Sequence, residues 1–169
     1  MRFKFAVIAA AAALLANPAL AAPEGSGFYA GLGVGMSDLS AGSFSGNDFA
    51  FKVFGGYDFV KFFGVEAAYL NGGSPSDHGV SVDVDGWELA LRGILPIGER
   101  GEVFAKLGYA WWNVDADGFG DDSASDLMYG IGGGFRFGDH LGARLEWERM
   151  DIEDTDSADL YTLSGYWKF

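Results

Sequence analysis

The sequence contains no cysteine and is poor in basic residues. Without cysteine there can be no disulfide, no thiol chemistry and no lipid-anchored N-terminal cysteine, so the folded chain must obtain its stability from other interactions. Lysine and arginine together number 11, against 24 aspartates and glutamates, and the formal net charge is −13. Because binding to a phosphate backbone requires a basic patch, we expect no nucleic-acid partner.

Long apolar runs are also scarce, and the only one lies at the start of the chain. Two basic residues precede an apolar stretch from Phe5 to Ala16, which Asn17-Pro18 ends. Ala19-Leu20-Ala21 then gives the small-x-small pattern that signal peptidase recognises. The stretch is shorter than the ~20 residues of a transmembrane helix. We therefore expect residues 1–21 to be a cleaved signal peptide and residues 22–169 to be the mature domain. Cleavage removes two cations, so the net charge changes from −13 for the whole chain to −15 for the mature domain.

Beyond the signal peptide, apolar residues alternate with polar or small ones, which is the period of a β-strand. In the last segment Tyr161, Leu163 and Trp167 share one face, while Thr162 and Ser164 lie on the other. Several of the segments approach the ~9–11 residues that a tilted membrane strand needs. Eight segments show the pattern: 28–36, 49–57, 63–69, 87–92, 103–111, 127–137, 140–149 and 161–169.

The connections between these segments alternate in length. Short or turn-like connections are predicted at 57–62, 96–102 and 137–140. Longer polar loops are predicted at 37–48, 71–82, 113–126 and 150–159. Short turns on one side and long loops on the other are typical of outer-membrane barrels, in which both termini are periplasmic and the long loops face outward.

A soluble β-sandwich or lipocalin-like barrel would also give each strand one apolar and one polar face. Two further features, besides the signal peptide, favour the membrane. The chain has 27 glycines, many on the polar face, where they weaken a strand exposed to water but fit a narrow lumen. Aromatic residues make up 16% of the chain and gather near both ends of the predicted strands, as the two membrane interfaces favour. We therefore predict an all-β fold, an eight-stranded antiparallel transmembrane β-barrel in the outer membrane of a Gram-negative bacterium.

Three segments and the last residue carry a family resemblance. The segments are Ala105-Lys106-Leu107-Gly108-Tyr109 with Trp112, Tyr129-Gly130-Ile131-Gly132, and Arg144-Leu145-Glu146-Trp147-Glu148-Arg149, and the chain ends on Phe169. On these residues the mature chain resembles the OmpA-like family of outer membrane protein β-barrels. The resemblance implies the architecture rather than one activity, and we expect no peptidoglycan-binding domain. It also implies that the terminal strand is a recognition signal for the barrel-assembly machinery. The signal residues are Tyr161, Leu163, Trp167 and Phe169.

Charged residues on the inward phase of the strands predict a filled lumen. Six cations and four anions in a narrow barrel need partners, so we expect an ion-pair network that plugs it. Phe54, Phe104, Trp112 and Tyr166 share the inward phase. A gated or selective pore is the alternative interpretation. The ten charges are Lys52, Glu66, Glu88, Arg92, Lys106, Arg136, Arg144, Glu146, Glu148 and Lys168.

Two predicted loops are acidic. Asn113-x-Asp115-x-Asp117-Gly118 is similar to the start of a calcium loop, but position twelve is Ala124 instead of glutamate. Solvated loops are therefore favoured, and weak divalent-cation bridging to lipopolysaccharide is the alternative. No metal site or cofactor is assigned. The acidic residues are Asp115, Asp117, Asp121, Asp122 and Asp126 in one loop, and Asp151, Glu153, Asp154, Asp156 and Asp159 in the other.

The two histidines give little support to catalysis. Some outer-membrane barrels act on lipid A through a His and a Ser two positions apart on one strand. Here Ser76 precedes His78 in a predicted loop, and His140 is followed at that spacing by Gly142. We expect a non-enzymatic barrel with a structural or surface-interaction role, in contact with outer-membrane lipid and lipopolysaccharide. The alternatives are a small porin-like or transport barrel for small solutes and, third, a lipid-modifying enzyme.

Overall fold

The computed structural model describes residues 25–41, 44–71, 76–77, 80–116, 119–152 and 156–169. The predicted signal peptide, residues 1–21, lies outside the described residues, and its cleavage stays a prediction. In the described residues, no helix has the length and apolar character needed to cross a membrane.

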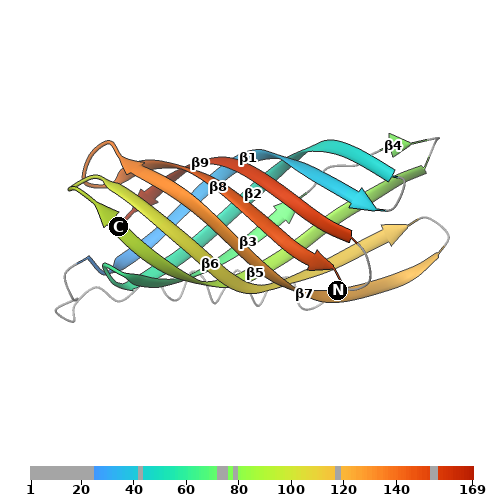
Figure 1. The fold of residues 1–169 in the computed structure, drawn as a ribbon, viewed down its shortest axis with the longest axis horizontal. Helices are drawn as coiled ribbons and strands as arrows, with labels where there is room; N and C mark the ends of the chain where they lie inside the picture. The colour runs from blue at the N-terminus through green and yellow to red at the C-terminus, as the bar shows by residue number, and fades with distance from the viewer. Residues whose placement is uncertain (1–24, 42–43, 72–75, 78–79, 117–118, 153–155) are drawn as a thin grey trace.

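The described chain forms a closed antiparallel barrel (Figure 1). Eight strands make the wall, and pairing of β3 with β5 and of β1 with β9 closes it. The short strand β4 pairs only with β5 in the described part of the chain. The predicted fold class is therefore confirmed. The strands are β1 (Gly27–Ala41), β2 (Phe44–Val60), β3 (Phe63–Asn71), β4 (Ser76–Asp77), β5 (Val80–Ile97), β6 (Gly101–Ala116), β7 (Phe119–Arg136), β8 (Leu141–Ile152) and β9 (Asp156–Lys168).

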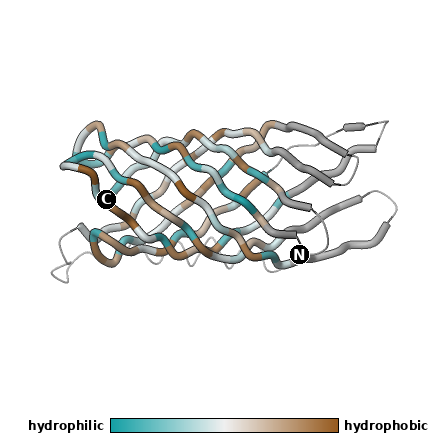
Figure 2. Tube along the Cα trace, viewed as in Figure 1, coloured by the Kyte–Doolittle hydropathy of each residue, from teal (hydrophilic) through white to brown (hydrophobic). Residues whose placement is uncertain are grey.

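Side chains alternate between the lumen and the outer wall, as the period of two predicts. In β3, Glu66, Ala68 and Leu70 are buried, while Ala67 between them is exposed. The outer wall carries large apolar side chains that are about half exposed, such as Leu32 at 57% and Leu145 at 64%. Figure 2 shows the resulting alternation of hydropathy along the strands. An apolar surface of this extent is stable against hydrocarbon, not against water.

The strands reach further than the sequence pattern predicts, and the expectation of four long loops is wrong over most of their length. β1 and β2 stay paired through Ser37↔Asp48 to Ala41↔Phe44, and β6 and β7 stay paired to Ala116↔Phe119. β8 and β9 likewise pair as far as Ile152↔Asp156, and residues 71–82 contain β4 and the start of β5. Neighbouring backbones supply the ladder hydrogen bonds, so pairing continues where the apolar alternation ends.

The two ends of the barrel differ. The turn end holds the turns 61–62, 98–100 and 137–140 together with the beginning of β1 and the end of β9. Gly98 has a φ of +64° in its turn, a conformation that glycine adopts without steric cost. The opposite end, the hairpin end, holds the extended β1–β2, β6–β7 and β8–β9 hairpins (Figure 1).

Inward glycines make room for aromatic rings in the lumen. A Cβ atom on Gly132 would overlap the ring of Phe104, and one on Gly142 would overlap the ring of Tyr166. Gly93, on the outer wall, has nothing within 4 Å of such an atom. The inward glycines therefore reflect the size of the lumen contents, which is what a barrel of eight strands imposes.

Candidate functional site

The buried interior of the barrel is layered along its axis. Following β2 from the hairpin end, the buried residues among those described are Ala50, Lys52, Phe54 and Asp58. Ala50 belongs to an apolar cluster and Lys52 to a charged layer. Phe54 belongs to an aromatic cluster, and Asp58 faces the turn end. The apolar cluster comprises Ala50, Leu70, Ala90, Ala110, Met128, Met150, Ala158 and Leu160.

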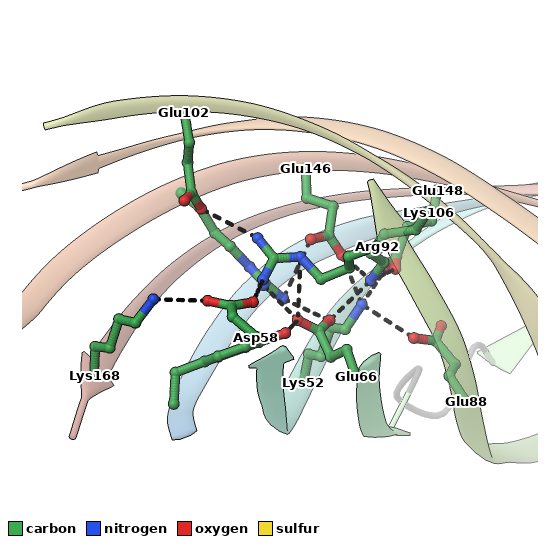
Figure 3. A network of polar contacts seen from close by, with 12 residues as sticks. Lys52, Asp58, Glu66, Glu88, Arg92, Glu102, Lys106, Glu146, Glu148 and Lys168 are labelled. Atoms are coloured by element: carbon green, nitrogen blue, oxygen red, sulfur yellow. Dashed lines mark hydrogen bonds and ion pairs between the residues drawn. The ribbon is translucent and has the colours of Figure 1, made fainter. Parts of the chain in front are cut away.

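Two lysines lie at the centre of the charged layer (Figure 3). The Lys52 ammonium lies 3.1 Å from a Glu88 carboxylate oxygen and donates to Glu146 at 2.8 Å. The Lys106 ammonium donates to Glu146 at 2.8 Å and to Glu66 at 3.0 Å. Both lysines also donate to Glu148. Since Lys52 comes from β2, Lys106 from β6 and the two shared glutamates from β8, the contacts cross the lumen from wall to wall.

Two arginines continue the network toward the turn end. Arg144 donates to both carboxylate oxygens of Glu66, at 2.6 and 2.8 Å, and its guanidinium lies 3.8 Å from the ring centroid of Phe54. Arg92 donates to Glu102 at 3.1 Å and lies 4.5 Å from the ring centroid of Phe104. A guanidinium group can donate hydrogen bonds to carboxylates from its N–H edge while its flat face stacks on an aromatic ring.

The network ends at the mouth of the barrel. The Tyr29 hydroxyl donates to Glu66 at 2.8 Å, and Lys168 donates to Asp58 at 2.8 Å. Arg92 also donates to Asp58 at 3.4 Å. Figure 3 shows Lys168, Asp58, Arg92 and Glu66 converging from several strands into one connected set.

Eight of the ten charges predicted for the lumen lie together and are at most 3% exposed. The other two, Arg136 and Lys168, are partly exposed at the turn end. The buried eight comprise four cations and four carboxylates, so their charges balance; an uncompensated buried charge would be very costly. The eight are Lys52, Glu66, Glu88, Arg92, Lys106, Arg144, Glu146 and Glu148.

Sequence reasoning missed three partners of the network. Asp58 and Glu102 lie in predicted turns, but the structure places them at the ends of β2 and β6. Tyr29 lies between outward Phe28 and Ala30, so the same alternation could have placed it inward. Extending the predicted segments 49–57 and 103–111 by one residue at the turn end would have found Asp58 and Glu102. The apolar cluster was also missed, although its members follow the inward phase.

At the turn end a cavity of about 620 Å³ opens below the charged layer. Arg92, Arg144 and Tyr29 line it from inside the barrel, and Lys61 and Arg136 line it nearer the rim. Among the described residues, the lumen is therefore occupied by the side chains of the apolar cluster and the charged layer, and it is hollow at the turn end.

The terminal strand presents the predicted signal residues on the outer wall. Tyr161, Leu163, Trp167 and Phe169 are each about half exposed or more. The Phe169 amide donates to the Phe28 carbonyl at 2.9 Å, which completes the seam between the two ends of the barrel sequence. These side chains therefore lie accessible on the outer face of the closing strand and at its end.

The candidate catalytic and metal residues are not brought together in the described residues. His140 is exposed, stacks on Trp167 with ring centroids 5.1 Å apart, and its Nδ1 donates to the Lys168 carbonyl at 2.7 Å. His78 and eight of the ten loop acids lie outside the described residues or side chains. Of the two described acids, Asp159 accepts two hydrogen bonds from Arg149 and one from Trp147, and Asp126 is buried. Among described residues, no group of three acidic, histidine or cysteine side chains is placed to hold a metal ion.

Comparison with known proteins agrees with this architecture. Neisserial surface protein A (NspA) superposes with a TM-score of 0.73 at 12% identity, covering 86% of this chain and all of that one. Ail, the attachment invasion locus protein of Yersinia pestis, gives 0.63 at 17% identity, covering 85% and 99%. The N-terminal β-barrel domain of Pseudomonas aeruginosa OprF gives 0.60 at 13%, covering 82% and 97%. At such identities the likeness concerns the fold alone.

No curated protein matches the chain. Residues 7–169 match the model of the outer membrane protein beta-barrel domain, and the chain therefore belongs to that family.

Proposed function

We propose that the protein is a closed outer-membrane barrel with a structural or surface-interaction role. Family membership implies the outer membrane of a Gram-negative bacterium. The observation that carries the closed state is the charged layer, in which Lys52 and Lys106 share Glu146 and Glu148 across the lumen. A hydrated ion that crossed this layer would have to separate buried, mutually paired charges, which is energetically costly.

The apolar cluster supports the same conclusion. It lies between the charged layer and the hairpin end, and Met128 and Met150 in it are 0% and 2% exposed. A dry apolar layer disfavours ion passage because ions shed their hydration there at high cost. A porin-like role would require a path through both layers.

Planar-bilayer recording tests the closed state. Protein refolded in detergent and added to a planar bilayer is expected to give no steady conductance at neutral pH. A matched variant, Met128→Gly with Met150→Gly, opens the apolar cluster and leaves the charged layer intact. Reproducible open channels of the unmodified protein would contradict the proposal and favour the porin-like alternative. The same recording of the variant shows whether the charged layer blocks ions without the apolar cluster.

The surface role is assigned to the extended hairpins. The structurally similar Ail forms a complex with the heparin analogue sucrose octasulfate. In this chain the predicted surface segments are rich in aspartate, so a sulfated polysaccharide would be repelled and a divalent cation attracted. We therefore propose that Ca²⁺ or Mg²⁺ bridges these hairpins to the phosphates of lipopolysaccharide.

Export and assembly complete the proposal. Residues 1–21 direct export to the periplasm and are then cleaved, and the barrel-assembly machinery recognises the exposed terminal strand with Phe169. The barrel is not an enzyme: the described histidine, His140, is engaged by Trp167 and by the Lys168 carbonyl rather than by a nucleophile.

A further inference from the structure

The cavity at the turn end has a lining whose charge is opposite to that of the chain. Five cations and two carboxylates line it, a local charge of +3, whereas the whole chain carries −13. The cavity is bounded by β1, β2 and β5–β9, so the cations point into one space from all around the barrel. The charged residues are Lys61, Arg92, Arg136, Arg144 and Lys168, with Asp58 and Glu102.

Two of these cations have no acidic partner among the described residues. Arg136 donates to the backbone carbonyl of Glu99 at 2.8 Å, and the Lys61 ammonium lies 5.0 Å from the ring centroid of Phe62. The two carboxylates of the lining already form ion pairs, Asp58 with Lys168 and Glu102 with Arg92. The rim of the cavity therefore carries positive charge that the described side chains do not neutralise.

Polar groups without partners also line the cavity. The Tyr166 hydroxyl is buried, with the residue 7% exposed, and accepts or donates no hydrogen bond within the described part of the chain. The same holds for the Nε atoms of Arg92 and Arg144. All three are N–H or O–H donors, and a buried donor without an acceptor costs free energy. An oxygen-rich ligand would supply the missing acceptors.

Apolar side chains complete the lining. Inward-facing Ile94 and Pro96 form one side, next to Phe62. A site with a guanidinium-rich wall and an apolar wall suits a molecule with an oxyanion at one end and carbon at the other, since guanidinium groups bind carboxylate and phosphate oxygens in pairs. We propose that the turn-end cavity binds a small anion that carries a carboxylate or phosphate group. This site is distinct from the hairpins and does not depend on whether the lumen conducts.

Titration followed by NMR tests the site. Isotope-labelled barrel in zwitterionic detergent is titrated with inorganic phosphate and with succinate, and glucose serves as the neutral control. The amides of Gly98 and Gly101, which line the cavity, are expected to shift saturably with the anions and not with glucose. The chemical shifts of amides in the apolar cluster, such as that of Met128, are expected to stay unchanged.

Charge-removing variants assign the response to the lining. The double substitution Lys61→Gln with Arg136→Gln is expected to weaken anion binding roughly tenfold or more, as loss of charged hydrogen bonds does. Arg100→Gln removes one cation from the adjacent turn, where the side chain is exposed and does not line the cavity, and is expected to leave affinity within about twofold. Tyr166→Phe keeps the ring and removes the hydroxyl, so it should weaken binding without any change of charge.

The anionic group of the ligand could belong to a soluble anion or to a lipid headgroup. A second experiment distinguishes these two sources. The barrel is placed in nanodiscs of phosphatidylcholine, with or without phosphatidylglycerol. If phosphatidylglycerol shifts the Gly98 and Gly101 amides and abolishes the phosphate response, the ligand is a headgroup. If phosphate binds equally in both nanodiscs, it is a soluble anion. The proposal is overturned if none of the three anions shifts these amides saturably, or if the double variant binds as tightly as Arg100→Gln does.

Discussion

Replacing Lys52 by methionine tests how much the charged layer stabilises the barrel. Lys52 is fully buried, and its ammonium contacts Glu88, Glu146 and Glu148. Methionine keeps most of the volume and removes the charge, so three buried carboxylates lose a cation. Removing one partner of a buried ion pair costs about 3–5 kcal/mol, and we expect the free energy of unfolding to fall by an amount in this range.

The assay is equilibrium unfolding in urea of protein refolded into phosphatidylcholine vesicles, followed by tryptophan fluorescence and heat-dependent gel mobility. Lys61→Met makes the same change at an exposed position and should alter stability by less than about 0.5 kcal/mol. Adding Glu148→Gln to Lys52→Met restores the balance of buried charge and should recover a large part of the loss. If Lys52→Met behaves like Lys61→Met, or if the double variant is no more stable than the single one, the charge-balance argument is wrong.

Three further predictions concern packing, assembly and the hairpins. Gly132→Ala forces a Cβ atom against the ring of Phe104 and should cost about 1–3 kcal/mol in the same urea assay, whereas Gly93→Ala on the open outer wall should cost far less. Deleting Phe169 should lower the outer-membrane yield of folded protein in cells more than it lowers stability after refolding; normal yield in membrane fractions would refute its role as a signal. Removing the carboxylates of one hairpin should weaken Ca²⁺-dependent binding of lipopolysaccharide and leave folding intact, and calorimetry of the unmodified protein that shows only heat of dilution would refute the bridging proposal. The hairpin variant replaces Asp115, Asp117, Asp121 and Asp122 by asparagine.

The sequence alone determined the barrel and the inward or outward side of most wall residues. Both follow from a local property, since successive side chains of a strand point to opposite faces. Lys52, Glu66 and Lys106 could thus be placed in the lumen before any contact was known. The strand ends were predicted poorly, because pairing of Ser37 with Asp48 depends on the neighbouring backbone and leaves no mark in the apolar pattern.

Only the tertiary structure decided which inward charges meet. Glu66 and Arg144 are 78 residues apart, and Lys52 and Glu148 are 96 apart, so their contact depends on strand order, tilt and register together. The same factors separate Arg136 and Lys168 from the buried set and leave the turn end hollow. Alternation assigns a side chain to a face, but its height along the barrel axis is set by how all eight strands stagger when the barrel closes.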